Sequence, residues 1–210
     1  MDVIDRPNGH RIFFLPVVRG LELERQKVGQ ALEESSPKVI ALSISPEELD
    51  GLEKFRGGNV PAANFEEDVY MERLSEFGEV SKPPPCFLEA RDQAKVRNLK
   101  LEPLDLNNED FTEAYVTHVT TIEMMFQGRV ERKLRGPHLQ ARTAEEFVLK
   151  FDKTINSKLG YRRLERARET HMAKRLAKLM DESATTLALV ELERAEGVRQ
   201  LLAQLPAAVL

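Results

Sequence analysis

The sequence predicts an α/β fold, with a central mixed sheet flanked by helices and a helical insertion before the last βα unit. Two short apolar runs flank a turn signal near the start, and nearly continuous apolar runs occupy residues 38–44 and 185–190. Segments with helical periodicity alternate with these strand-like runs at both ends of the chain, as α/β proteins require. The predicted parts are 1–107, the N-terminal part of the α/β domain, 108–158, a helical insert, and 159–210, a helix–strand–helix that completes the domain.

Turn, capping and breaker signals set the predicted elements. Asn8-Gly9 favours a hairpin turn, Ser45 and Glu48 form a capping box around Pro46, and the triple proline 83–85 indicates a loop. Cys86 beside it is expected to be a partly buried, inert thiol. The predicted order is strands 3–5 and 11–15, helix 21–35, strand 38–44, a helix from 46, helix 64–77, strand 99–104, helices 108–126, 143–155 and 161–180, strand 185–190 and helix 195–205.

Two of these helices have assigned faces. The helix 108–126 is predicted to be continuous, and Gly160 is predicted to separate the helix 143–155 from the long helix after it. The apolar face expected on the first is Phe111, Tyr115, His118, Ile122 and Met125. The stripe expected on the long helix is Tyr161, Leu164, Met172, Leu176 and Leu179, with Arg168 and Arg175 inside it. A buried arginine needs a carboxylate or a bound anion, and Glu165 and Glu169 stand close in sequence to Arg168.

Composition excludes several classes of function. The sequence has one cysteine, no apolar run of about 18 residues and no signal-peptide core at its start, so we expect a cytoplasmic chain without a membrane anchor. Residues 129–178 hold 15 basic and 6 acidic side chains. Because few aromatic residues accompany them, a solvated surface is favoured over a nucleic-acid site, although an anion-binding patch stays open as an alternative.

The sequence contains no catalytic motif that stands on its own. P-loop, dinucleotide-binding, zincin and nucleophile-elbow spacings are missing, and neither His10 nor His138 has a second ligand at metal-binding spacing. His118 is expected to be a hydrogen-bonded core residue. No metal, cofactor or confident catalytic residue is therefore predicted.

Three segments nevertheless follow the motif order of a known family. Residues 37–52 resemble P-D-V-V-A-V-E-L-D-x-x-R-L-x-A-L, residues 168–176 resemble R-[DN]-x-x-M-A-x-x-L, and residues 186–198 resemble V-V-A-V-V-G-A-G-H-x-x-G-I. These are motifs of the TraB family, which is related to the pheromone-shutdown and Tiki proteins. The resemblance implies an α/β scaffold whose G-x-x-H motifs and strand glutamate assemble a metal-dependent hydrolytic centre.

This sequence departs from the family at those motifs. Arg19 and Arg194 stand where the resemblance implies histidines, and Ser43 stands where it implies the glutamate. Guanidinium offers no lone pair to a metal, so the family's metal site is not expected. The residues expected to form the altered site are Arg19, Ser43, Asp105, Arg168, Glu169, Glu193 and Arg194.

The predicted function is that of a noncatalytic, degenerate TraB-like protein that binds a small anionic or peptide ligand or serves as a regulatory or assembly partner. If the arginines converge, they form either an anion site or, with Glu169, Glu191 and Glu193, an internal salt-bridge network. The alternative function is a metal-dependent hydrolase with ligands from His10, His118 or His171. A homo-oligomer formed through the insert is a further alternative.

Overall fold

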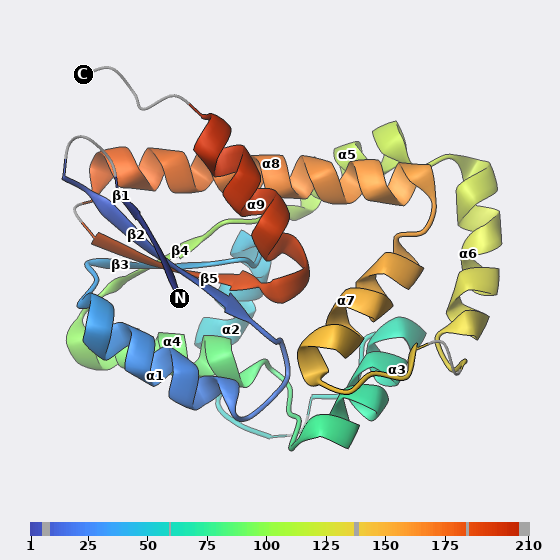
Figure 1. The fold of residues 1–210 in the computed structure, drawn as a ribbon, viewed down its shortest axis with the longest axis horizontal. Coiled ribbons are helices and arrows are strands. Elements are labelled where there is room, and N and C mark those ends of the chain that lie inside the picture. The colour runs from blue at the N-terminus through green and yellow to red at the C-terminus, as the bar shows by residue number, and fades with distance from the viewer. Residues whose placement is uncertain (6–8, 59, 137–138, 184, 206–210) are drawn as a thin grey trace.

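A five-stranded mixed sheet lies at the centre of the molecule (Figure 1). The computed structural model describes residues 1–5, 9–58, 60–136, 139–183 and 185–205. Its strand order is β1 (Asp2–Asp5), β2 (Arg11–Val17), β5 (Thr185–Glu191), β3 (Val39–Leu42) and β4 (Lys100–Pro103). Only the β1–β2 pair is antiparallel; the other neighbours are parallel. The predicted α/β class is confirmed, and the carboxyl ends of four strands share one edge.

Helices cover both faces of this sheet (Figure 1). One face carries α1 (Glu24–Ser35) and α4 (Pro85–Arg97), with α2 (Pro46–Lys54) beside α4. The opposite face carries α8 (Leu159–Glu182) and α9 (Leu192–Gln204), which pack closely against each other. Two helical layers therefore enclose the sheet.

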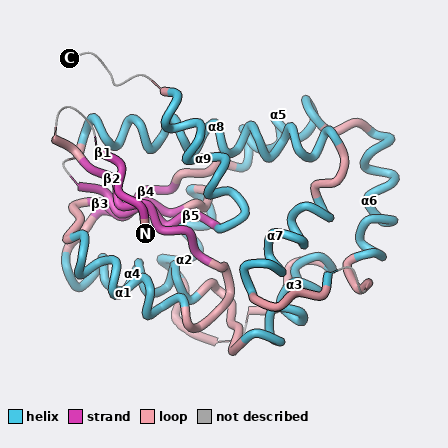
Figure 2. The backbone as a smooth tube through the Cα atoms, in the orientation of Figure 1, coloured by secondary structure: helices cyan, strands magenta, loops and turns pink. Residues whose placement is uncertain are grey.

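The remaining helices lie beyond the carboxyl edge or along α8 (Figure 2). They are α3 (Phe65–Leu74) with the 3-10 turn η1 (Ser75–Phe77), α5 (Asn108–His118), α6 (Thr121–Lys133) and α7 (Ala144–Ile155). Three of these four, α5 to α7, fall in the segment between β4 and β5, where the sequence predicts a helical insertion.

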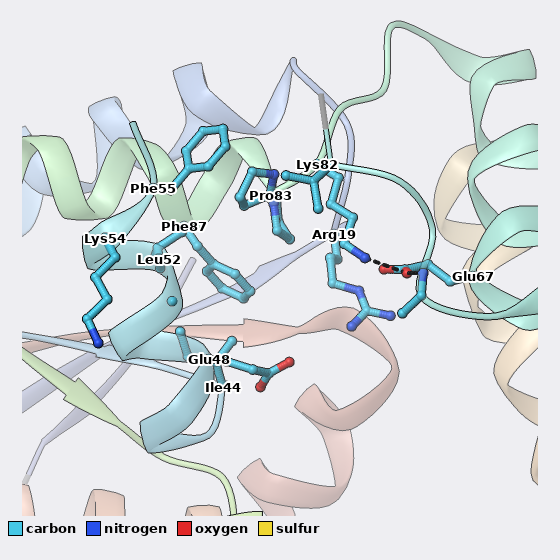
Figure 3. Close-up of a pocket in the computed structure, with 14 residues that line it drawn as sticks. Arg19, Ile44, Glu48, Leu52, Lys54, Phe55, Glu67, Lys82, Pro83 and Phe87 are labelled. Atoms are coloured by element: carbon cyan, nitrogen blue, oxygen red, sulfur yellow. Dashed lines mark hydrogen bonds and ion pairs between the residues drawn. The ribbon is translucent and has the colours of Figure 1, made fainter. Parts of the chain in front are cut away.

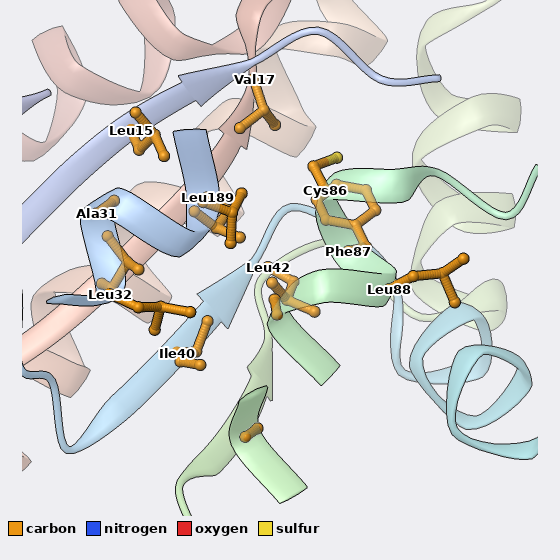
Figure 4. Packing of buried hydrophobic residues seen from close by; sticks show 14 of the residues in the cluster. Leu15, Val17, Ala31, Leu32, Ile40, Leu42, Cys86, Phe87, Leu88 and Leu189 are labelled. Atoms are coloured by element: carbon orange, nitrogen blue, oxygen red, sulfur yellow. The ribbon is translucent and has the colours of Figure 1, made fainter. Parts of the chain in front are cut away.

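Alternating side chains of the parallel strands build two separate cores. Ile40 and Leu42 of β3 pack toward α1 and α4 (Figure 4), whereas Val39 and Ala41 pack toward α8 and α9. All four are buried, as expected for a strand with helices on both sides. The continuous apolar pattern of this segment follows from burial on both faces.

A third core joins α3 to the insert. Tyr70 of α3 packs against Phe147 and Phe151 of α7, with ring centroids 5.7 and 5.2 Å apart. Thr143 caps α7 by accepting a hydrogen bond from the Glu146 amide, as the sequence predicts. This third core places α7 close to the carboxyl edge of the sheet.

The predicted helix 108–126 is wrong as a single helix. The chain breaks after α5 at Val119, and Thr120 starts α6 with a capping box to Glu123. A residue that caps one helix has extended backbone, so it cannot continue the preceding helix. Much of the predicted apolar face is consequently exposed, with Ile122 at 66% and Met125 at 78%.

Two other boundaries differ from the prediction. Gly160 lies inside α8, which begins at Leu159, and does not separate two helices. Glycine is required there by close packing, because a Cβ at this position would come 2.6 Å from the His118 carbonyl oxygen. The triple proline is not only a loop: Pro85 is the first residue of α4, a helix not predicted from the sequence. Proline suits that position because its missing N–H has no partner in a first helical turn.

The predicted pairing of the first two strands is confirmed. The hairpin strands pair from Asp2 opposite Phe14 to Asp5 opposite Arg11, although turn residues 6–8 lie outside the described residues, as do Pro137 and His138. Pro103 is tolerated because β4 is an edge strand.

Among the described helices, none is both long and apolar enough to cross a membrane.

Candidate functional site

The candidate site is built where the parallel strands end. Ser43 follows β3, and its hydroxyl accepts a 2.9 Å hydrogen bond from the amide of Glu191, the last residue of β5. Arg19 follows β2 just before Gly20, whose positive φ turns the chain away from the sheet. Ligands of open α/β sheets usually bind at this edge.

Arg19 and Glu191 form the first ion pair of the site. Their Nη1 and Oε1 atoms lie 3.2 Å apart, with the Glu191 side chain buried and that of Arg19 38% exposed. Tyr70 supports the arginine from α3: its ring stacks 5.7 Å from the guanidinium carbon, and its hydroxyl donates to the Arg19 carbonyl oxygen at 3.0 Å. Arg19 is therefore held in place but keeps an exposed side.

Arg168 and Arg194 belong to a second, shared group of ion pairs. Arg168 of α8 donates to Asp105, which follows β4, and its Nη1 donates to Glu165 at 2.9 Å. Arg194 of α9 pairs with Asp152 of α7 and lies 3.1 Å from the same Glu165 carboxylate. Glu165 thus bridges two arginines and links α8 to α9.

Glu169 and Glu193 complete the acidic side of the site. Glu169 Oε1 lies 3.6 Å from Arg194, and a Cβ at Gly197 of α9 would collide with this carboxylate. Burial raises the pKa of Glu193 to about 7, with a further contribution from the charge of Glu191. Its Oε2 atom is buried without a hydrogen-bond partner in the described structure.

The residues predicted from the sequence come together here. Arg19, Arg168, Glu193 and Arg194 line one cavity of about 170 Å³, which Tyr70, Asp152, Glu165 and Glu191 also line. The other predicted residues are adjacent: Ser43 contacts Glu191, Asp105 contacts Arg168, and Glu169 contacts Arg194. Arg175 lies elsewhere and pairs with Glu102 of β4 at 2.9 Å.

The charge balance of this cavity favours a network over an anion site. Each of the three arginines already has a carboxylate partner, and six carboxylates stand within the group. Burial also raises the pKa of Glu165 and Glu191, despite the opposing charge of the nearby arginines. A bound anion would add further negative charge to a group in which carboxylates already outnumber arginines.

A larger cavity of about 540 Å³ opens on the other side of Arg19 (Figure 3). Its wall is mainly apolar and is formed by Ile44 after β3, Leu52 of α2, Phe87 of α4 and, from the connecting segments, Phe55, Val60, Pro83 and Pro84. Arg19, Lys54 and Lys82 supply positive charge, and Glu48 and Glu67 supply negative charge. Lys82 donates to Glu67 at 2.5 Å.

Sequence reasoning missed this larger cavity. Its walls come from two interruptions, around Gly57-Gly58 and at the triple proline, which the sequence predicts only as loops. The sequence signal for this cavity is the presence of apolar residues, such as Phe55 and Val60, within those connecting segments.

The described histidines are placed away from both cavities. His10 lies at the opposite edge of the sheet, beside the first residue of β2, where its Nδ1 contacts the Met180 carbonyl oxygen at 2.6 Å. His118 and His171 line a separate groove along α8. Within the described residues, no three His, Cys, Asp or Glu side chains are arranged to hold a metal ion. These side chains therefore do not fit the metal that the family resemblance implies.

The motif positions of that resemblance nevertheless meet in space. Arg19, Ser43 and Arg194 come from three different chain segments, and all lie at the carboxyl edge around Glu191. Comparison of the chain with models of known protein families and with curated protein sequences gives no match.

Proposed function

We propose that this protein is a noncatalytic binder of a small ligand that has an apolar body and one anionic group. The observation that carries the proposal is the 540 Å³ cavity, which joins an apolar wall to the exposed side of Arg19 at the carboxyl edge of the sheet. Ligand sites of this size are typically apolar with a few placed polar groups.

The cations of the larger cavity support an anionic ligand group. Arg19 is paired with Glu191, and a guanidinium has five N–H donors, so Arg19 can also donate to a ligand oxygen without releasing that partner. Glu48 is already engaged, because its carboxylate accepts the Ser45 amide at 2.9 Å. Lys82 also lines this cavity, but its charge is offset by the ion pair with Glu67, so Arg19 is the cation that the proposal assigns to the ligand.

A degenerate relationship to the TraB family is part of this proposal. It is supported by the ordered motifs in the sequence and by the meeting of their positions at one edge of the sheet. The noncatalytic assignment is supported by arginines at the two positions where the resemblance implies histidine, and by the carboxylates that occupy those arginines.

Decanoate is a suitable probe, since it combines a short apolar chain with one carboxylate, and decanol is its uncharged analogue. Titration calorimetry on the full chain is expected to show saturable decanoate binding that is at least about tenfold tighter than decanol binding. No decanoate binding would refute the proposal, and equal affinity for decanol would refute the anionic group.

Two glycine substitutions locate the binding. Gly51→Trp adds a ring at the larger cavity, whereas Gly29→Trp adds one on α1 away from it; a Cβ at either position meets no atom within 4 Å. Only Gly51→Trp is expected to weaken decanoate binding, by about tenfold or more. Equal effects of the two substitutions would place the ligand elsewhere, and circular dichroism checks that both variants fold.

A further inference from the structure

A basic groove runs along the outer face of α8, outside the cavities discussed above. It has a volume of about 500 Å³ and lies between the end of α5 and α8. Three cations, Arg163, Arg166 and Lys174, line it together with His118 and His171. Leu106 and Ala167 supply its apolar surface.

The spacing of these cations follows from the helix. Residues 163, 166, 170 and 174 are separated by three or four positions, so they share one face of α8. At 1.5 Å per residue, the row from Arg163 to Lys174 is about 16 Å long. Thr170 and His171 fall between the cations and add neutral polar groups to the row.

The cations in this groove are less closely paired than those of the buried network, although Glu123 lies near enough to Arg163 for that charge to help lower the Glu123 pKa. No carboxylate lines the groove, and among the described residues neither Arg163 nor Lys174 has a hydrogen bond or ion pair. Arg166 has one partner, Glu169 at 3.3 Å, and its side chain is half exposed. Arg168, two positions further along, is by contrast paired with both Asp105 and Glu165.

We infer that this groove binds a short chain of linked phosphoryl groups, such as a di- or triphosphate moiety. A single phosphate could engage only one or two of the cations, whereas linked phosphates extend along the row. The two histidines can donate N–H groups to phosphate oxygens in either neutral tautomer. Among the described residues that line the groove there is no Phe, Tyr or Trp, which disfavours an RNA or DNA strand because such strands are held partly by base stacking.

Inorganic tripolyphosphate tests this inference directly, without a nucleoside or lipid attached. Calorimetric titration of the full chain at about 0.15 M salt is expected to show tripolyphosphate binding at least about tenfold tighter than orthophosphate binding. Equal affinities would overturn the requirement for linked phosphates. Tighter binding of a ten-residue oligouridylate than of tripolyphosphate would overturn the ligand class in favour of nucleic acid.

A charge-matched pair of variants distinguishes the groove from general attraction to a basic helix. Arg163→Ala/Lys174→Ala removes the two unpaired cations of the groove, and Arg162→Ala/Lys178→Ala removes two exposed cations of α8 outside it. The first variant is expected to weaken tripolyphosphate binding at least about tenfold, and the second less than about threefold. Equal losses would refute the groove. Decanoate binding in the larger cavity should be unchanged in both variants, so the two proposals fail independently.

Discussion

Replacing Arg194 by alanine tests whether the buried ion pairs form a structural network. The Arg194 side chain is only 6% exposed and contacts Asp152, Glu165 and Glu169. Removal of one partner from a buried ion pair costs about 3–5 kcal/mol. Here Glu165 keeps Arg168 as a partner, and Asp152 is partly exposed, so the lower end of that range applies.

The expected loss of unfolding free energy is therefore about 3 kcal/mol, which corresponds to a fall in Tm of about 6–12 °C for a chain of this size. Urea denaturation and calorimetry measure these two quantities. The loss should be smaller at pH 5 than at pH 8. Burial already raises the pKa values of Glu165 and Glu169, so protonation at low pH relieves the charge that the variant leaves unpaired.

Arg199→Ala is the matched control, because Arg199 lies on the same helix and pairs with Glu196 at the surface. Exposed pairs contribute about 0–1 kcal/mol, so this variant should be nearly as stable as the wild type. Equal losses for the two variants would refute the network. If Arg194→Ala is instead stable and abolishes a stabilising effect of phosphate or sulfate, the cavity is an anion site.

Three further predictions concern other parts of the molecule. Burial raises the folded-state pKa of Glu193 to about 7, so its contribution to stability is full below its ordinary pKa of 4.5 and is lost as the pH rises through 7. Glu193→Gln should remove this pH dependence, and in urea denaturation the variant should gain up to about 3 kcal/mol of unfolding free energy at pH 8 but little at pH 4. Equal gains at both pH values would contradict this prediction. Burial raises the pKa of the Cys86 thiol, so a thiol-reactive dye should label it only after unfolding, and rapid labelling of the native chain would disprove this. If the insert forms a homo-oligomer, Ile122→Ser/Met125→Ser should reduce the mass measured by light scattering, whereas a wild-type monomer at micromolar concentration would exclude that assembly.

The sequence predicted those parts of the fold that depend on local signals. Ser45, Thr143 and Asn8-Gly9 act within a few residues, and the helix starts and hairpin that they indicate are present in the structure. The break at Thr120 was missed because the apolar spacing of residues 108–126 suits one long helix. The capping box of Thr120 with Glu123 is a local signal for this break.

The site could be predicted only as a set of residues. Arg19, Ser43, Arg168 and Arg194 occupy motif positions of the resemblance. The parallel strands bring Arg19 and Ser43 to one edge, and α8 and α9 bring Arg168 and Arg194 to the same edge. Their partners could not be assigned, because Asp152 reaches Arg194 from α7, a helix of the insert whose position depends on the third core. Whether a convergent set of arginines is open or neutralised is a property of tertiary packing.

The close approach at Gly160 limits which sequences can adopt this arrangement. The Gly160 amide donates to Glu123 at 2.7 Å, and any side chain there would meet the His118 carbonyl oxygen, a backbone atom that cannot rotate away. Gly51, Gly29 and Gly128 have open space around them and can be replaced without such a conflict. Across divergent relatives of this chain, glycine at position 160 should therefore persist where α5 and α8 meet in this way, while Gly29 and Gly128 vary freely.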